Sequence, residues 1–389
     1  MHEVIMLRSQ YPDARLEKEA HTLINNGYKV TLLVWDKGRK IEQLHSNSNY
    51  DNLIIKKIKL NAELGSLKVP FFLLIYWLFI IYELLKSRYD IIHASDFDTY
   101  LPALFISKVR RMPIVYDIFD FYSDMIDFPV FANMMRVTIG NLDRFLMRFA
   151  NAIIIVDDSR LKQIGIESNE NVTSIYNSPM YKLVDGKKAG QSKSNANFTI
   201  FYGGTVVAER NIDKMILAVK DLNDVELEVM GPCPKSYGEY LIDLARGHAN
   251  INLFFQMVPH EDILIHTSEA DVLFAIYSTE IKNNIYSSPN KLFEAMMFGK
   301  PIIVNDGTSM ANIVREECCG IIIKDGNVSE IQNAIFKLKR DIKLRRKLGD
   351  NGQKAYDLKY NWHIMEKRLL RIYKGIIDDE GKCHRSRAL

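Results

Sequence analysis

The segment VIMLRSQYPDARLEKEAHTLINNGYKVTLLVW (residues 4–35) decides the fold class of this 389-residue chain. Its apolar run Val4–Leu7 suits a buried parallel strand, and Leu16–Ile24 then places apolar residues at helical spacing. Asn25-Asn26-Gly27 is typical of a helix end, after which Tyr28–Trp35 has the composition of a second strand. Strand, helix and strand in this order predict a right-handed crossover and a parallel sheet.

The same alternation continues along the whole chain, without a repeat of 20–50 residues. The segment Lys182–Asn197 interrupts this alternation. It is polar and rich in Lys, Ser and Gly, which predicts a linker. We therefore predict an α/β chain with two doubly wound, Rossmann-like domains that face a cleft, at residues 1–181 and 198–358. The further expected strands are Ile91–His93, Ile114–Tyr116 and Ile153–Val156 in the first domain, and Phe198–Tyr202, Glu226–Met230, Ile251–Phe255, Val272–Ile276, Pro301–Val304 and Ile321–Ile323 in the second, with a helix at Ile212–Val219.

Composition and charge exclude several classes of protein. Hydrophobic residues make up 47% of the chain and charged residues 25%, as in ordinary globular proteins. With 51 Lys and Arg against 48 Asp and Glu, the net charge is only +3, which does not favour a nucleic-acid partner. The four cysteines show no C-x-x-C spacing and the first residues do not resemble a secretory signal, so we expect a reducing, cytoplasmic location.

One segment, Phe71–Tyr82 (FFLLIYWLFIIY), is apolar on every side and is flanked by Lys68 and Lys86. It is shorter than the roughly 18–20 residues that span a bilayer. Two interpretations remain open: a helix buried in the fold or in a dimer, or an interfacial helix whose flanking cations meet anionic head groups. Arg110-Arg111 and Lys37–Lys40 favour the second, which predicts peripheral attachment to the inner face of the membrane.

Several common signatures are absent from the sequence. No G-x-G-x-x-G follows the first strand, and no Walker-type phosphate loop is present, which argues against a dinucleotide oxidoreductase and a P-loop enzyme. His260 and His266 are six residues apart and cannot share a helical face as zinc ligands would. Asp96-Phe97-Asp98 belongs to the first domain, where we expect a solvated pair at a strand end, so no metal is expected.

The most informative stretch for chemistry is SSPNKLFEAMMFGKP (residues 287–301). Ser288 is a good N-cap, Pro289 suits the first helical turn, and a helix start of this kind binds phosphate through free N–H groups and its dipole. Lys291 in the first turn is unfavourable unless an anion lies opposite. Glu294, one turn later, is placed to accept hydrogen bonds from a sugar diol.

A second anion-binding pattern precedes it at FYGGTVVAERNI (residues 201–212). A strand, the Gly203-Gly204 turn, the basic residue Arg210 and a helix follow one another. This order lets both backbone and guanidinium approach an anion.

Together these residues resemble the retaining glycosyltransferases of family 4, almost from end to end. That family has the two-domain GT-B fold and uses nucleotide-sugar donors, here UDP- or GDP-linked. The resemblance implies that the last helix, residues 359–378, crosses back to the first domain and leaves a tail at 379–389. The matching segments are Pro12–Ala20, Tyr89–Asp96, Pro113–Asp117, Val258–Ile263, Ala270–Val272 and Tyr360–Trp362.

By the same resemblance, Glu294 holds the donor ribose, Arg210 holds the diphosphate with help from Lys291, and these three carry catalysis. It also places Gly203, Gly204, Val258 and Ser288 at the donor, without metal. The implied activity is transfer of a hexose with retention to a glycan or lipid-linked acceptor, in polysaccharide or glycolipid synthesis. The residues implied on the acceptor side are Asp13, Arg15, His93, Asp96, Asp117 and Asp120.

Two positions depart from the family pattern. Tyr286 stands where the first Glu of the Glu-x7-Glu motif would lie, and Phe119 stands where a histidine often follows the strand. These departures leave two alternatives open: a catalytically degenerate scaffold or activator subunit, and a nucleotide-sugar 2-epimerase, which needs no acceptor.

Overall fold

The computed structural model describes residues 1–37, 51–61, 68–126, 132–166, 171–180, 197–324 and 326–386. The chain divides into two compact units: Met1–Ile175 together with Glu366–Leu389, and Tyr176–Met365. The expected linker 182–197 lies outside the described residues except for Asn197.

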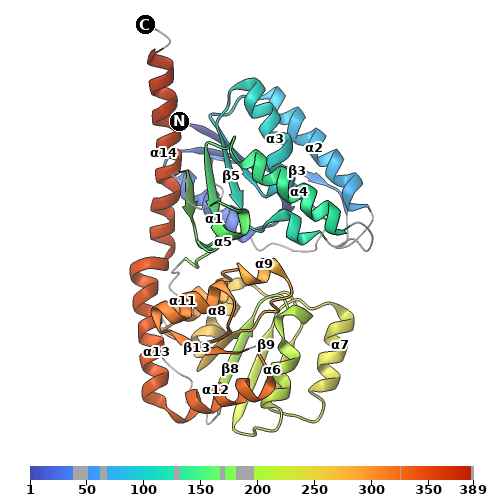
Figure 1. Cartoon of the computed structure of the whole chain (residues 1–389), viewed down its shortest axis with the longest axis vertical. Coiled ribbons are helices and arrows are strands. Elements are labelled where there is room, and N and C mark those ends of the chain that lie inside the picture. The colour runs from blue at the N-terminus through green and yellow to red at the C-terminus, as the bar shows by residue number, and fades with distance from the viewer. Residues whose placement is uncertain are drawn as a thin grey trace. The chain divides into compact units, whose positions relative to one another are not determined.

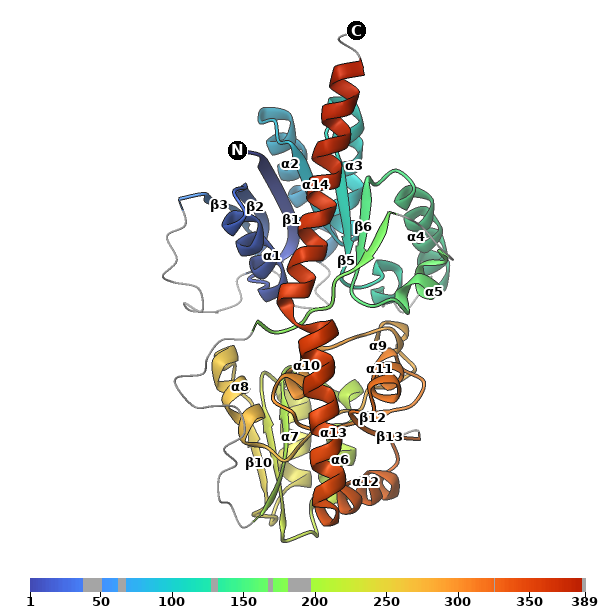
Figure 2. The same ribbon diagram turned by 90° about the vertical axis from the view of Figure 1, so that its left-hand side faces the viewer.

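The first unit is built on a seven-stranded sheet in the order β3-β2-β1-β4-β5-β6-β7, with every neighbouring pair parallel. Figures 1 and 2 show helices on both faces, α2 and α3 on one and α1 and α14 on the other. The strands are β1 (Glu3–Tyr11), β2 (Lys29–Asp36), β3 (Leu53–Lys59), β4 (Ile91–Ser95), β5 (Ile114–Ile118), β6 (Ala152–Ile155) and β7 (Val172–Ser174). The helices are α1 (Ala14–Asn25), α2 (Val69–Lys86), α3 (Phe97–Arg110), η1 (Tyr122–Met125), α4 (Ala132–Met147), α5 (Arg160–Ile164) and α14 (Trp362–Ser386).

The second unit repeats this plan with a six-stranded parallel sheet in the order β10-β9-β8-β11-β12-β13. Its strands are β8 (Phe198–Gly203), β9 (Val225–Met230), β10 (Ile251–Phe254), β11 (Val272–Ala275), β12 (Ile302–Asn305) and β13 (Gly320–Ile323). Its helices are η2 (Ala208–Arg210), α6 (Ile212–Val219), α7 (Lys235–Leu244), α8 (His260–Glu269), α9 (Lys282–Ile285), α10 (Asn290–Met297), α11 (Ser309–Glu317), α12 (Val328–Arg340), α13 (Ile342–Ala355) and the π-helical turn η3 (Tyr356–Tyr360).

Both sheets change winding direction once, between their central strands. In the first unit the chain winds outward from β1 through β2 to β3, and then from β4 to β7 on the other side. In the second unit the same change falls between β8 and β11. The carboxyl ends of strands at such a switch point form the usual ligand crevice of open α/β sheets. We therefore expect ligand-binding and catalytic side chains to lie at the two switch points.

The predicted doubly wound architecture is confirmed, with two strands that the sequence did not reveal. β3 contains three lysines in seven residues and runs along the sheet edge, where Ile54 and Ile55 remain exposed. Such an edge strand lacks the apolar run of a buried parallel strand. β7 has only three residues.

The last helix extends further than predicted. α14 runs to Ser386, through most of the expected tail 379–389, because no proline or turn cluster interrupts residues 373–386. From Glu366 onward it belongs to the first unit.

Candidate functional site

In the second unit, two cations meet at the switch point between β8 and β11. The guanidinium carbon of Arg210, in η2, lies 3.8 Å from the ring centre of Tyr277, which follows β11. The Nζ of Lys291, in the first turn of α10, donates to the Tyr277 hydroxyl at 3.1 Å and lies 4.4 Å from the ring centre of Tyr202, in β8. Arg210 also donates to Oδ1 of Asn284 at 2.7 Å. Sequence reasoning predicted the two cations but missed Tyr202, Tyr277 and Asn284.

These two cations have neutral partners. Among the described residues no carboxylate bonds or pairs with the side chain of Arg210 or of Lys291, and Lys291 is buried. A buried ammonium group is costly unless an opposite charge compensates it. The buried ammonium group of Lys291 and the half-buried guanidinium of Arg210, around one tyrosine, are therefore a candidate site for an anion.

Glycines keep the space beside these cations open. A Cβ at Gly204 would lie 3.4 Å from Nζ of Lys291, and its φ of +133° disfavours any other residue. A Cβ at Gly203 would meet Cγ2 of Ile263 at 2.5 Å. The predicted glycine turn thus serves two purposes: Gly203 permits close packing on α8, and Gly204 leaves the ammonium group unobstructed.

The start of α10 differs from the prediction. Pro289 is extended (φ −71°, ψ 152°), so the helix begins at Asn290 and the N-cap is Pro289 instead of Ser288. The N-cap Pro289 makes no side-chain hydrogen bond to the first turn, and the buried Ser288 lies one residue before Pro289. An N-cap of this kind leaves the amide groups of the first turn without the usual capping oxygen, and such amides suit an anion.

Glu294 is held in place by a histidine that sequence reasoning did not assign to the site. The buried Glu294 contacts Nε2 of His260, the first residue of α8, at 2.7 Å between Oε1 and Nε2. Val258 is half-buried in the segment just before this helix. His266, at the other end of α8, contacts Glu228 instead, so the two histidines serve different carboxylates. Tyr286, the departure from the family pattern, is half-buried at the end of α9.

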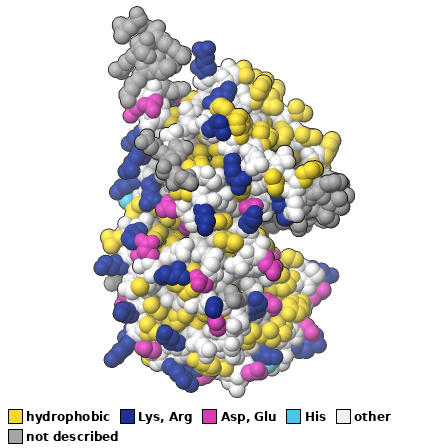
Figure 3. All heavy atoms as spheres, viewed as in Figure 1, with side chains coloured by type: hydrophobic (Ala, Val, Ile, Leu, Met, Phe, Trp, Pro, Cys, Tyr) yellow, Lys and Arg dark blue, Asp and Glu magenta, His cyan; other side chains and the backbone are white. Residues whose placement is uncertain are grey.

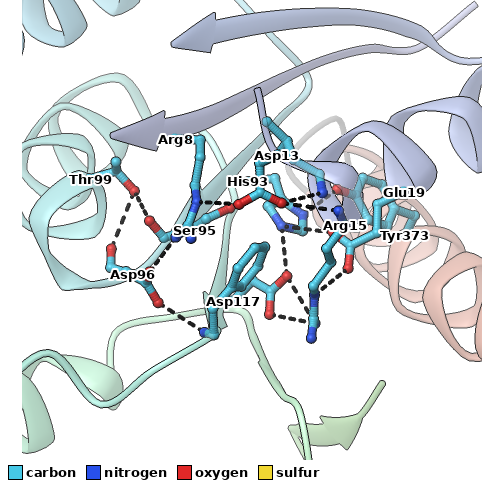
Figure 4. Close-up of polar contacts among 12 residues, drawn as sticks. Arg8, Asp13, Arg15, Glu19, His93, Ser95, Asp96, Thr99, Asp117 and Tyr373 are labelled. Carbon is cyan, nitrogen blue, oxygen red and sulfur yellow. Dashed lines mark hydrogen bonds and ion pairs between the residues drawn. The ribbon is translucent and has the colours of Figure 1, made fainter. Parts of the chain in front are cut away.

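In the first unit, a second cluster occupies the switch point between β1 and β4 (Figure 4). Arg15 donates from Nε to Glu19 at 3.0 Å and from Nη2 to Asp117 at 2.9 Å. His93 lies between them, with Nε2 3.3 Å from Asp117 and Nδ1 2.8 Å from the hydroxyl of Tyr373 on α14. All four groups around His93 are buried. The cluster is therefore internally paired.

Burial also sets the charge of this cluster. It lowers the pKa of His93 to about 4, so the imidazole is neutral at pH 7. It raises the pKa of Glu19 to about 7, with Asp117 adding to the shift and Arg15 opposing it. It raises the pKa of Asp117 to about 6, again against the attraction of Arg15. Near neutral pH the cluster therefore holds one cation and one to two anions.

The ligand atoms of Glu19, His93 and Asp117 lie within 4.8 Å of one another, a spacing that suits a metal ion. Arg15 already donates to both carboxylates, however, and its positive charge would oppose a second cation at the same place. The donor set therefore fits an arginine-centred ion-pair network better than a metal.

A second layer of contacts surrounds Phe119. The guanidinium carbons of Arg8 and Arg15 lie 4.1 Å and 4.4 Å from its ring centre. Arg8 also donates to Asp13 and to Asp96. Phe119 thus organises two cations by its ring face, a role that a histidine acting on protons would not perform.

The six residues expected on the acceptor side converge on this edge, but most of them are engaged internally. Asp13 is the N-cap of α1 and accepts from the backbone N–H of Arg15 and Leu16. Asp96 accepts from the backbone N–H of Phe119 and Asp120, and both it and Asp98 are buried, so the expected solvated pair was wrong. Arg15, His93 and Asp117 are buried as described. Asp120 pairs with Arg160 at 2.7 Å and keeps a side chain that is 46% exposed.

Three residues of this cluster were missed: Arg8, Glu19 and Tyr373. Glu19 carries a signal, because it lies four residues after Arg15 on one helical face. Arg8 directly follows the apolar, buried run Val4–Leu7 of β1, where a basic residue also requires a partner. Nothing in the sequence around Tyr373 links it to His93, which lies far away along the chain.

Comparison with known proteins matches the second unit to a family. Residues 185–355 match the family Glycosyl transferases group 1. This segment is similar to that family over less than half of the chain. It contains the whole cation cluster together with Glu294 and His260. The capsular polysaccharide biosynthesis glycosyltransferase CapM of Staphylococcus aureus is 26% identical over 200 residues, which is 48% of this chain and 49% of CapM. The chain thus aligns with about half the length of this relative.

Solved structures share the architecture of the whole chain. A sucrose-phosphate synthase from Thermosynechococcus elongatus superimposes with a TM-score of 0.73 at 13% identity, over 97% of this chain and all of the other. The Anabaena protein HepE, solved in complex with UDP-glucose, gives a TM-score of 0.68 at 14% identity, over 96% of this chain and all of the other. At these identities the likeness concerns the fold. The fold is GT-B, as predicted.

Proposed function

We propose that this chain is a retaining glycosyltransferase that transfers a hexose from a UDP- or GDP-linked donor to a glycan or lipid-linked acceptor. The observation that carries the proposal is the pairing of Arg210 and Lys291 around Tyr277 without a carboxylate. A donor diphosphate supplies the charge that these cations lack. The HepE structure with UDP-glucose and the name of CapM support the donor class and a role in polysaccharide synthesis.

In this proposal the residues act on the leaving diphosphate. The bond between the sugar anomeric carbon and the diphosphate oxygen breaks, and the acceptor oxygen bonds to the same carbon from the same face. The acceptor proton passes to the diphosphate oxygen. Arg210, Lys291 and the uncapped first turn of α10 stabilise the negative charge that develops there. Glu294, oriented by His260, accepts hydrogen bonds from the donor ribose.

We further propose that no metal is needed and that the enzyme works in a reducing compartment. In this proposal Arg210 and Lys291 balance the charge of the donor diphosphate. Cys233, Cys318 and Cys319 are free thiols. Free thiols persist in the cytoplasm. Activity that is unchanged by EDTA would support the first point, and a loss restored by a divalent ion would contradict it.

The test is a titration of the purified chain with UDP, GDP and their hexose conjugates, followed by calorimetry and thermal shift. We expect one nucleotide family to bind, and Lys291→Gln to weaken that binding at least tenfold. Arg315→Ala is the matched control, because Arg315 is an exposed cation of the same unit that already pairs with Asp306. If no nucleotide binds, or if the control weakens binding equally, the proposal fails.

Product analysis separates the alternatives. Binding without turnover on any acceptor would indicate a degenerate scaffold, in line with Tyr286 and Phe119. Conversion of the donor sugar without an acceptor would indicate a 2-epimerase. Formation of a glycoside with the anomeric configuration of the donor supports the proposed transfer.

A further inference from the structure

The solvent-facing side of α2 is an apolar stripe. Phe71, Leu74, Leu78, Tyr82 and Leu85 follow one another at intervals of three and four residues, which places them on one helical face. Each is between 52% and 66% exposed. A helix on the surface of a soluble domain normally presents polar residues on that side.

The opposite side of α2 is fixed to the domain. Tyr76, Ile80 and Leu84 are fully buried, and the Tyr76 hydroxyl contacts the carbonyls of Arg8 and Leu33 in the sheet. Arg110 donates to carbonyls at the end of the helix, including those of Leu84 and Leu85. The helix is long and apolar enough to cross a membrane by length and composition alone. Because it is packed along the sheet, its apolar stripe faces outward along the surface of the domain.

Two neighbouring helices extend the same surface. α3 packs beside α2, where Nε1 of Trp77 donates to the carbonyl of Asp98, and exposes Phe105 and Val109. α4 packs beside α3, where the Tyr100 hydroxyl donates to the carbonyl of Leu146. Figure 3 shows hydrophobic side chains gathered over the part of the unit where α2 and α3 lie. The exposed apolar residues on and just after α4 are Met134, Val137, Leu142, Phe145 and Phe149.

The charges on this three-helix surface have one sign. The carboxylates on α2, α3 and α4 are Glu83, Asp98 and Asp143, and all three are buried. Glu83 pairs with Lys56, and Asp143 accepts from the Tyr116 hydroxyl. Among the described residues, these helices therefore expose no carboxylate.

Three exposed cations on or just after these helices lie near exposed aromatic rings. Lys86 is 5.4 Å from the ring centre of Tyr82, Lys108 is 5.9 Å from that of Phe149, and Arg148 is 4.3 Å from that of Phe145. Aromatic rings flanked by long basic side chains suit the boundary between acyl chains and head groups, where the ring is buried and the cation remains at the phosphate level.

We propose that the three-helix surface of α2, α3 and α4 docks the protein on an anionic phospholipid bilayer. The apolar stripe enters the interface, and Lys86, Lys108 and Arg148 contact lipid phosphates. A second copy of the chain fits this surface poorly, because a two-fold contact would bring cations onto cations with no exposed carboxylate between them. This surface goes beyond the proposed activity and involves none of the donor-site residues.

Vesicle co-sedimentation of the full chain tests the proposal. We expect strong binding to phosphatidylcholine vesicles that contain phosphatidylglycerol, weaker binding to phosphatidylcholine alone, and release at high salt. Leu78→Glu with Phe105→Glu should reduce binding at least about tenfold. Tyr240→Glu with Ile242→Glu is the matched control, because both residues are exposed on α7 in the second unit. Equal loss in the control, or no loss in the first pair, would overturn the proposal.

A second measurement remains informative if the acidic variant folds poorly. Leu78→Trp retains the apolar character of the surface, and its fluorescence should be quenched by brominated lipids, whereas Tyr240→Trp should not be. Absence of quenching, or a dimer that Leu78→Glu dissociates while vesicles do not bind, would assign the surface to protein contact instead. Arg210→Ala should bind vesicles like the wild type, so failure of the donor-site proposal and failure of the lipid proposal are distinguishable.

Discussion

The switch points of the two units use charge in opposite ways. In the first unit, Arg15 is surrounded by carboxylates that it neutralises, and His93 is bonded on both ring nitrogens. In the second unit, Arg210 and Lys291 have only amide and aromatic partners among the described residues. The first cluster is paired without a ligand and the second is not. We therefore expect the cluster around Arg15 to stabilise the fold, and the cluster of Arg210 and Lys291 to bind an anion.

The largest expected effect concerns the paired cluster. Asp117→Ala leaves Arg15 buried without one of its two carboxylates, which should lower the free energy of unfolding by about 3–5 kcal/mol. Urea denaturation followed by circular dichroism measures it. Glu3→Ala, which breaks the exposed pair with Lys29, should change stability by less than about 1 kcal/mol. An Asp117→Ala protein as stable as the wild type would remove the distinction between the two clusters.

Substitution in the cluster of Arg210 and Lys291 should lower catalytic activity and leave stability nearly unchanged. Arg210→Ala removes a charge-assisted contact to the diphosphate and should raise the activation free energy by about 2–4 kcal/mol. Its free energy of unfolding should change little. Steady-state kinetics and urea denaturation on the same preparation test both statements. A stability loss that accounts for the lost activity would place Arg210 with the structural residues.

Glu294 extends the comparison, because it is the one buried carboxylate among the described residues of the second unit and is bonded to His260. Glu294→Ala should weaken donor binding by about 1.5–3 kcal/mol, mainly through the ribose contact. His260→Ala should have a smaller effect in the same direction, since the histidine only orients the carboxylate. Calorimetric titration of the donor measures both. A larger loss for His260→Ala than for Glu294→Ala would reverse their roles.

A further expected effect is a pH dependence of stability in the first unit. The pKa of Glu19 is raised by burial from its ordinary value of 4.5 to about 7, so its contribution to stability is greatest below pH 4.5 and is lost as the pH rises through 7. Glu19→Gln removes this term. The variant should therefore gain stability relative to the wild type as the pH rises from 5 to 7. A difference in unfolding free energy that is constant or falls with pH would contradict the shifted pKa.

The parallel sheets could be predicted because their strands are buried on both faces and read as apolar runs. The switch-point cations were also predictable: a lysine in the first turn of a helix is unfavourable without an anion, and a basic residue between a glycine turn and a helix is placed to approach one. β3 was missed because its lysines belong to an exposed edge. The start of α10 was misplaced by one residue, because proline is common in a first helical turn but Pro289 adopts an extended conformation here and is the N-cap.

Local sequence patterns could not predict which residues from distant parts of the chain contact one another. Tyr277 and Tyr202 resemble ordinary core residues until β8 and β11 lie side by side. The buried state of Asp96 depends on Arg8, from another strand. Aspartates at strand ends look the same in sequence whether they bind a sugar or cap a helix. All six expected acceptor-side residues proved to have partners within the first unit, and Asp120 is the one of the six that keeps an exposed side chain.

The bond between Tyr373 and His93 has a consequence for the order in which this protein matures. Domains generally fold from the N-terminus as the ribosome releases them. The first unit here includes residues 366–389, so the domain that begins at Met1 remains incomplete until these residues have been synthesised. The second unit, Tyr176–Met365, is contiguous in sequence and is fully synthesised earlier. The domain that begins first is thus completed last, and a nascent chain stalled before residue 366 would lack the tyrosine that saturates His93.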